Sequence, residues 1–185
     1  MLLLLVIVVI GALLAIAGCR TSRSGSKSAP YKVVRTDGDF ELRDYPALKL
    51  VETAMKDGGS GGSFNRLFRF ITGGNDAGKK IAMTTPVFMA DGESTMAFVM
   101  PADLDKVPQP TDGSVAVREM PAGRFAVLRY SGARSVQQET EHMDRLKTWV
   151  ADQHLKVSAA PVYAYFDPPW TPPFLRRNEV MLRID

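Results

Sequence analysis

Six basic residues occur in three close pairs, and they are the side chains best suited to bind an anionic ligand. The pairs are Arg66 and Arg69, Lys79 and Lys80, and Arg176 and Arg177. Guanidinium and ammonium groups bind carboxylates through charge-assisted hydrogen bonds. The pairs are therefore either a binding site for an acidic small molecule or ordinary solvated surface charge.

Residues suited to catalysis are few in this chain. Its two histidines, His142 and His154, are twelve residues apart, which places them about 120° apart around a helix. The sequence contains no HExxH, GxSxG or GxGxxG motif, and no Lys follows the run GGSGGS (58–63) at the spacing of a phosphate loop. We predict no catalytic residue and no protein-built metal site. Each histidine is either an axial iron ligand or a solvated helix residue.

Four of the nine methionines lie between residues 83 and 100 of the chain: Met83, Met89, Met96 and Met100. The methionine side chain is flexible and polarisable, and it adapts to irregular apolar surroundings. The cluster therefore either fills the core or lines an adaptable groove for a flat ligand.

The N-terminal residues 2–18 are apolar and carry no charge, and Cys19, the single cysteine, follows them directly. The junction Ile16-Ala17-Gly18-Cys19 resembles a bacterial lipobox, in which the chain is cut before a cysteine that then carries a lipid. We therefore predict a signal peptide over 1–18 and a protein lipid-anchored at Cys19, facing the periplasm in the cell envelope. Because no basic residue precedes the apolar run, an uncleaved N-terminal membrane anchor is the alternative.

The charge distribution separates a basic tether from a neutral domain. The three excess positive charges of the chain lie within residues 19–29, in a segment rich in Ser and Gly. We predict a flexible basic tether over 19–30, which contacts anionic lipid headgroups, and a domain over 31–185. A neutral domain lacks the basic footprint that phosphate binding requires, so nucleic acid is not an expected partner.

Alternating apolar and polar residues predict an antiparallel β-rich domain. The expected strands occupy residues 31–35, 40–45, 47–55, 79–90, 94–101, 114–121, 123–132, 161–166 and 178–184. Pro46 and Pro121 each end a strand, because proline has no N–H to donate to the ladder. Residues 56–63, KDGGSGGS, are expected to form a flexible loop.

Apolar residues at helical spacing predict two helices, over residues 64–74 and 136–154. Ser63 and Ser135 are the expected N-caps, and Ser135 with Gln138 is a possible capping box. The expected buried stripes are Phe64, Leu67, Phe68 and Ile71 in the first helix, and Val136, Met143, Leu146, Trp149 and Val150 in the second.

The two halves of the chain resemble each other at a fixed offset. LRDYPA (42–47) recurs as VREMPA (117–122), and TPVF (85–88) recurs as APVY (160–163), each 75 residues later. We interpret the offset as a duplication with repeats over about 31–105 and 106–185. The predicted fold is α+β, a distorted antiparallel β-barrel of two pseudo-symmetric ββαββ repeats with two flanking helices.

The second half contains a proline-rich insertion over residues 166–177, FDPPWTPPFLRR, that the first half lacks. Its four prolines predict a stiff, extended loop. The loop presents Trp170, Phe174, Arg176 and Arg177, and we predict that these residues contribute to ligand binding because a departure from symmetry often marks a site.

Several segments together resemble the SOUL/haem-binding protein family. They are FELRDYPA (40–47), FNRLFRFITGGN (64–75), KKIAMTTPVFM (79–89), MAFVMP (96–101) and FLRRNEVML (174–182), in the order typical of the family. The resemblance covers residues 31–185. It implies a barrel with two helices and non-enzymatic binding of a tetrapyrrole, usually haem, in a shallow apolar groove.

By the same resemblance, the groove lies at the first helix, and its residues here are Arg66, Leu67, Phe70, Ile71 and Lys79. The histidine proposed as an iron ligand in the family precedes that helix, and this sequence has none there. The fold also resembles effector-binding domains of bacterial regulators, although no helix-turn-helix accompanies it.

Three functions follow from these observations. The first is a lipid-anchored haem or tetrapyrrole carrier or buffer, without enzymatic activity. The second is a binding module for another planar or amphipathic small molecule. The third is an envelope structural or interaction domain without a ligand, in which Trp170 and Phe174 would fill the groove.

Overall fold

The computed structural model describes residues 27–55, 59–90 and 94–185. The predicted signal peptide, Cys19 and most of the predicted tether lie outside these residues. The strands are β1 (Lys27–Ser28), β2 (Lys32–Asp37), β3 (Phe40–Tyr45), β4 (Leu48–Ala54), β5 (Thr84–Thr85), β6 (Val87–Ala90), β7 (Thr95–Val99), β8 (Val115–Met120), β9 (Gly123–Tyr130), β10 (Val162–Tyr165) and β11 (Asn178–Ile184). The helices are α2 (Gly59–Ile71), α3 (Val136–Asp152) and the 3-10 turn η2 (Pro173–Leu175).

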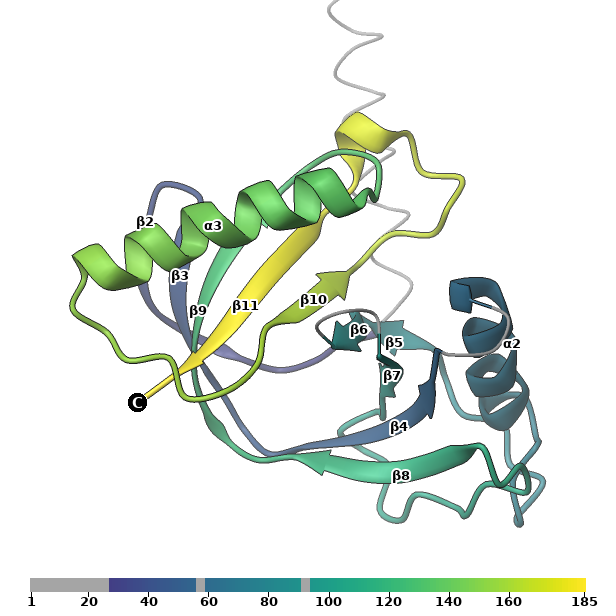
Figure 1. The fold of residues 1–185 in the computed structure, drawn as a ribbon. Helices are drawn as coiled ribbons and strands as arrows, with labels where there is room; N and C mark the ends of the chain where they lie inside the picture. The colour runs from purple at the N-terminus through teal and green to yellow at the C-terminus, as the bar shows by residue number, and fades with distance from the viewer. Residues whose placement is uncertain (1–26, 56–58, 91–93) are drawn as a thin grey trace, which may run out of the picture.

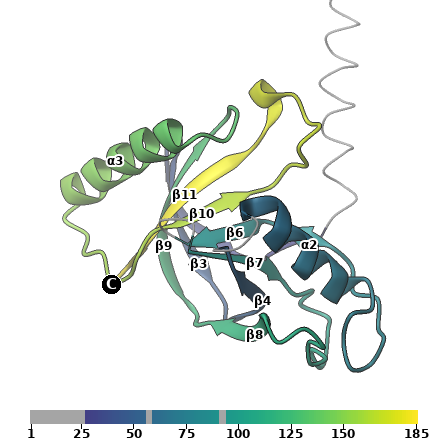
Figure 2. The same cartoon turned by 45° about the vertical axis from the view of Figure 1, so that its right-hand side comes forward.

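Nine strands form one antiparallel sheet, in the order β2-β3-β9-β11-β10-β6-β7-β4-β8 (Figure 1). Helix α3 packs on β9 and β11, and helix α2 packs on β4 and β7. Strands β10 and β6 therefore lie between the two helices in the sheet, as a second view shows (Figure 2). The predicted α+β class is confirmed, with the sheet forming a half-barrel.

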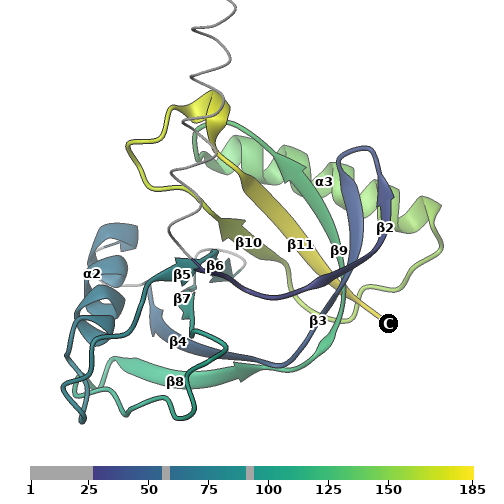
Figure 3. The ribbon, with the colours of Figure 1, turned by 180° about the vertical axis from the view of Figure 1, so that it is seen from behind.

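Side chains alternate between the two faces of the sheet and form two apolar clusters. The first cluster includes Leu42 and Leu128 of the strands together with residues of both helices. The second includes Tyr45 and Phe125 and contains no helical residue. Because neither α2 nor α3 contributes to the second cluster, its side chains bury one another, and the sheet curls around them (Figure 3).

The two proline motifs form neighbouring corners of the sheet. Pro46 separates β3 from β4, and Pro121 separates β8 from β9. Tyr45 lies opposite Gly123 on one side of these corners, and Leu48 lies opposite Met120 on the other. The predicted strand ends are confirmed, while the duplication of the two halves stays a prediction.

Helix α2 begins at Gly59, so the prediction that residues 59–63 form a loop was wrong. Ser63, predicted as the N-cap, is buried within the helix, where its hydroxyl donates to the carbonyls of Ala54 (3.2 Å) and Gly59 (3.0 Å). The contact with Ala54 joins the start of α2 to the end of β4, which offsets part of the low helix propensity of the glycines.

Helix α3 begins as predicted and ends at Asp152, two residues before the predicted end, and its first residue differs in burial. The Ser135 hydroxyl accepts a hydrogen bond from the Gln138 amide, which confirms the N-cap. Val136, predicted to be buried, is exposed, and Glu139 is buried instead. Glu139 is stabilised there by hydrogen bonds from Arg134 and Tyr165.

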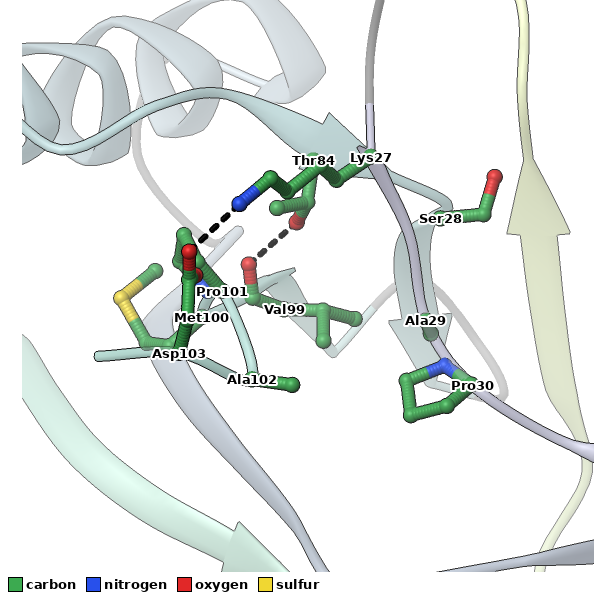
Figure 4. A pocket seen from close by; sticks show the side chains of 10 residues that line it. All are labelled: Lys27, Ser28, Ala29, Pro30, Thr84, Val99, Met100, Pro101, Ala102 and Asp103. Atoms are coloured by element: carbon green, nitrogen blue, oxygen red, sulfur yellow. Dashed lines mark hydrogen bonds and ion pairs between the residues drawn. The ribbon is translucent and has the colours of Figure 1, made fainter. Parts of the chain in front are cut away.

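Residues 27–30, assigned to the tether by sequence, lie against the folded domain. Strand β1 pairs in parallel with β5, and the amide of the buried Ala29 donates to the Thr85 carbonyl at 2.7 Å. Lys27 forms an ion pair with Asp103 (Figure 4). Within the described part of the chain, no helix has the length and apolarity needed to cross a membrane.

Candidate ligand-binding surface

A row of side chains crosses the sheet between the two helices. Tyr165 of β10 lies opposite Val87 of β6, and Val87 lies opposite Phe98 of β7. All three belong to the face that carries the helices. Phe98 is buried, whereas Val87 and Tyr165 are only half-buried and are accessible to a ligand.

Helix α2 adds two aromatic rings to this row. The ring of Phe64 meets Phe98 edge-on, with centroids 5.1 Å apart, and it stacks with Phe68 at 6.0 Å. Phe64 is 36% exposed and Phe68 is 46% exposed. We call Phe64, Phe68, Val87 and Tyr165 the inter-helix strip, and it offers the flat apolar contacts that suit a planar ligand.

The apolar arc of α2 explains why these rings stay exposed. At about 100° per residue, Phe64, Leu67, Phe68, Phe70 and Ile71 together cover about 160° of the helix circumference. That arc is wider than the stripe of about 100° that a helix normally buries. One edge of it therefore remains at the surface, and it is the edge formed by Phe64 and Phe68.

Basic residues gather at the C-terminal end of α2. Between residues 59 and 81 there are four basic residues and one acidic residue, Asp76, in a domain whose total charge is balanced. Arg69, Lys79 and Lys80 are exposed. The end of α2 therefore attracts anionic groups such as ligand carboxylates.

Asn75 holds the loop that carries Lys79. Its side-chain oxygen accepts a hydrogen bond from the Lys79 amide at 2.9 Å. Its Nδ2 donates to the carbonyls of Lys79 (2.7 Å) and Phe70 (2.9 Å). Asn75 thus fixes Lys79 against the last turn of α2. Sequence reasoning did not single out this residue, although its position after Gly73-Gly74 is typical of a structured turn.

Polar aromatic residues border the strip on the α3 side. The Tyr165 hydroxyl donates to the Glu139 carboxylate, which also accepts from Arg134 Nε at 3.1 Å. Burial raises the pKa of Tyr130 and of Tyr165, so both are neutral phenols at physiological pH. The Tyr130 hydroxyl is buried and makes no hydrogen bond within the described residues.

His142 stacks on Tyr130 with ring centroids 4.0 Å apart. Its Nδ1 is 2.6 Å from the Gln138 carbonyl, which can only accept, so Nδ1 carries a proton and donates it. In the neutral ring, Nε2 is then free to bind a metal, an arrangement that metal-ligating histidines commonly use. His154, in contrast, is exposed beyond the C-terminal end of α3. Across the described residues, no group of three or more His, Cys, Asp or Glu side chains could hold a metal ion.

The residues predicted at the first helix have different environments. Leu67, Phe70 and Ile71 are 0%, 2% and 3% exposed and attach α2 to the sheet. Arg66 donates to Thr53 Oγ1 at 3.0 Å and to the Ala54 carbonyl at 2.5 Å. Lys79 is exposed. Of these five residues, Lys79 is the one that the structure leaves most accessible to a ligand.

The residues predicted in the proline-rich loop divide into two groups. Trp170 and Phe174 project from the loop and are 82% and 75% exposed. Arg176 donates to carbonyls within the loop, and Arg177 donates to Glu179 and to Tyr31. The two arginines thus stabilise the loop and its base.

The methionine cluster fills the core. Met89, Met96 and Met100 are buried in the first apolar cluster, and the half-buried Met83 packs against it. Of the two interpretations of this cluster, the structure supports core filling.

Two cavities lie away from the inter-helix strip. One, of about 180 Å³, lies beside β1 and is lined in part by Thr84, Val99 and Met100 (Figure 4). The other, of about 500 Å³, lies at the proline corners. It contains Asp44, Asp185 and a single cation, Arg124, which is already paired with Asp44 at 2.7 Å. The first is small for a tetrapyrrole, and the second has an unfavourable charge for an acidic ligand.

Comparison with known protein families identifies the chain. A family model described as SOUL heme-binding protein matches residues 26–183. The chain belongs to the SOUL heme-binding protein family. This membership confirms the resemblance found in the sequence and supports a haem or tetrapyrrole as the ligand. No curated protein matches the chain.

Solved structures confirm the fold at low sequence identity. The C-terminal domain of EcmrR has 13% identity and a TM-score of 0.54, over 84% of this chain and 98% of that one. An uncharacterized conserved protein from Listeria innocua has 10% identity and a TM-score of 0.59, over 80% and 92%. A hydrolase from the same organism has 9% identity and a TM-score of 0.53, over 82% and 94%. These similarities show that the SOUL chain shares their fold.

The residues of the inter-helix strip fit the chemistry of haem. Haem is a flat apolar ring with two carboxylates and a central iron. The strip provides aromatic contacts, the end of α2 provides exposed cations, and His142 provides the ring nitrogen Nε2, which the hydrogen bond to Gln138 does not use.

Proposed function

We propose that this SOUL protein is a lipid-anchored haem carrier or buffer that holds the tetrapyrrole against the inter-helix strip, without catalysis. One observation carries this proposal: half-exposed Phe64 and Phe68 stack beside the basic end of α2. A shallow, open surface suits reversible binding and transfer of a ligand.

Each part of the proposed surface has a separate role. Phe64 and Phe68 contact the ring of the tetrapyrrole. Arg69, Lys79 and Lys80 attract its carboxylates through charge-assisted hydrogen bonds. We assign His142 Nε2 as the nitrogen that would coordinate the iron when haem is bound.

The proposed anchor rests on the N-terminal sequence. Residues 2–18 are apolar, and Cys19 follows a lipobox-like junction. We propose that Cys19 carries a lipid and that the domain faces the periplasm. An uncleaved apolar anchor is the alternative, and mass spectrometry of the mature N-terminus distinguishes the two.

The binding surface is tested by titrating haemin and metal-free protoporphyrin into residues 27–185, which contain every described strand and helix. We expect saturable binding of both ligands. Phe68→Ser is expected to weaken both by about tenfold or more, because a stacked aromatic contact of about 1–3 kcal/mol is lost. Phe174→Ser is the matched control, since Phe174 is also an exposed phenylalanine, and it should leave binding unchanged.

His142→Ala tests the iron ligand separately. We expect it to shift the haemin Soret band and leave protoporphyrin binding intact. Absence of saturable binding with either ligand would contradict the proposed function. An effect of Phe174→Ser without an effect of Phe68→Ser would move the site to the proline-rich loop.

A second candidate function is the binding of another planar amphipathic molecule. It is favoured by the absence of a histidine before α2. Equal affinity for haemin and protoporphyrin, together with an unchanged Soret band in His142→Ala, would support it. The third candidate is a structural domain without a ligand, for which we expected Trp170 and Phe174 to fill the groove. Both side chains are exposed, which does not support this candidate.

A further inference from the structure

The proline-rich loop exposes the two most accessible large apolar side chains of the described chain. Trp170 is 82% exposed and Phe174 is 75% exposed, and both come from a segment of only twelve residues, 166–177. Large aromatic side chains grouped at a surface usually mark an interaction site. Neither ring contributes to the core, so their exposure needs another explanation.

The loop is built to hold these rings outward. Arg176 Nε donates to the Thr171 carbonyl at 2.7 Å, and its Nη2 donates to the Pro169 carbonyl at 2.5 Å. The amide of Gly132 donates to the Pro173 carbonyl at 3.0 Å. Four prolines restrict the backbone further. The aromatic rings are thus exposed by an ordered loop, which lowers the entropy cost of inserting them into a partner.

The base of the loop lies where the N-terminal segment joins the domain. Ala29 and Phe166 belong to the same apolar cluster. The hydroxyl of Tyr31 accepts a hydrogen bond from Arg177 Nη2 at 3.0 Å. The loop and its turn η2, yellow in Figure 1, form one end of the molecule, and the C-terminus lies at the opposite end. The N-terminal segment therefore enters the fold beside the base of the loop.

The length of the chain before Lys27 places the loop close to the proposed anchor. Lys27 is eight residues after Cys19, a span of at most about 28 Å. Arg20 and Arg23 lie in this span, and their positive charges are attracted to anionic lipid headgroups. A domain held this close to a bilayer by residues at the loop base brings the loop itself within reach of the lipid.

We propose that Trp170 and Phe174 insert into the interfacial region of the lipid bilayer beside the anchor and fix the orientation of the domain on the membrane. This inference rests on the lipid anchor of the proposed function. Tryptophan favours the membrane interface because its ring is apolar and its N–H is polar. A second contact of this kind restrains a domain that a single lipid anchor would leave free to rotate.

The experiment follows Trp170 fluorescence in the full, lipidated chain on vesicles of phosphatidylcholine and phosphatidylglycerol. The chain has two tryptophans, so Trp149→Phe leaves Trp170 as the single reporter. Trp149 is buried, stacks on Phe40 and donates to Asp37, so its replacement can weaken the fold. The fluorescence of Trp170 is therefore also obtained by subtracting the spectrum of Trp170→Phe from that of the unchanged chain. This difference keeps Trp149 in place.

We expect a blue shift of Trp170 emission and quenching by lipids brominated near the headgroup. The control is Val157→Trp in a chain with Trp149→Phe and Trp170→Phe. Val157 is 47% exposed and pairs with Ile184 near the C-terminus, away from the loop. Its emission should be neither shifted nor quenched.

Flotation of the vesicles separates the two proposals. If the protein floats with the vesicles while Trp170 stays unquenched, the loop proposal is overturned and the anchor stands. If the protein does not float, the anchor fails and the loop proposal fails with it. A shift of Trp170 without vesicles, caused by rising protein concentration or by haemin, would also overturn the proposal, because the loop would then contact a second copy or the ligand.

Discussion

At the scale of single residues, the fold depends on a charged pair in its interior. Arg43 of β3 and Glu179 of β11 are 1% and 0% exposed, and they are joined by two hydrogen bonds of 2.7 and 3.0 Å. Arg177 Nε adds a third bond to Glu179 at 2.8 Å. Such a pair is tolerated in a core only when the hydrogen bonds offset the loss of hydration. It also connects the sheet with the base of the proline-rich loop.

Glu179→Gln should therefore be strongly destabilising. The change removes the fully buried carboxylate and leaves Glu41, 2.6 Å from Arg43 Nε, as the remaining carboxylate partner of that guanidinium. Because one of its two ion pairs survives, the expected cost is below the roughly 3–5 kcal/mol of an entirely broken buried pair, at about 2–3 kcal/mol of unfolding free energy. Urea unfolding followed by circular dichroism measures the loss. Asp44→Asn is the control, since Asp44 pairs with Arg124 at the surface, and it should barely move the midpoint. Equal losses in the two variants would contradict the argument.

At the scale of elements, sequence patterns predicted most strands and the start of α3, but not the start of α2. The alternation of apolar and polar residues and the positions of the prolines located β3, β4, β8 and β9. Both signals could be used because they depend only on neighbouring residues in the sequence. The start of α2 could not be predicted locally, since Gly and Ser have low helix propensity and the contacts of Ser63 with β4 are tertiary.

The glycine-rich start of α2 also leads to a stability prediction. Gly61 is exposed, and a Cβ atom added there would meet no atom within 4 Å. Gly61→Ala should raise the unfolding free energy by about 0.5–1 kcal/mol, because alanine loses less backbone entropy in a helix. Thermal unfolding followed by circular dichroism measures the gain.

Gly59 provides the matched control for this prediction. Its φ is +61°, a left-handed conformation that alanine adopts only with strain. Gly59→Ala should therefore give no gain, or a lower midpoint, although the added methyl group also meets open space. A similar gain at both positions would show that the backbone of residues 59–61 differs from the described one.

At the scale of the whole molecule, the family, the fold class and the basic end of α2 could be predicted from sequence, but the inter-helix strip could not. The strip combines residues of α2, β6 and β10, and the register of three strands brings them together. The sequence-based prediction that Phe64 and Phe68 are buried was wrong. As ligand contacts, sequence reasoning chose Leu67, Phe70 and Ile71 of the same helix. The structure buries these side chains and exposes Phe64 and Phe68, because only the packed sheet determines which edge of the helix is covered.

The position of the N-terminal segment decides how far the domain would stand from the proposed anchor at Cys19. Residues 27–31 contribute the β1–β5 pairing, the buried Ala29 and the Tyr31 ring, which lies 4.3 Å from the Arg43 guanidinium. A chain that begins at residue 32 should lose about 2–4 kcal/mol of unfolding free energy relative to one that begins at residue 27. Urea unfolding measures this difference.

Lys27→Ala is the control for this comparison. The ion pair of Lys27 with Asp103 is exposed, so its loss should leave the urea midpoint unchanged. Equal stability of the two shortened chains would mean that residues 27–31 belong to the tether. Cys19 would then be thirteen residues from the domain, with a reach of about 45 Å instead of about 28 Å. The same measurement therefore tests whether the tether is short enough to keep Trp170 and Phe174 at the membrane surface.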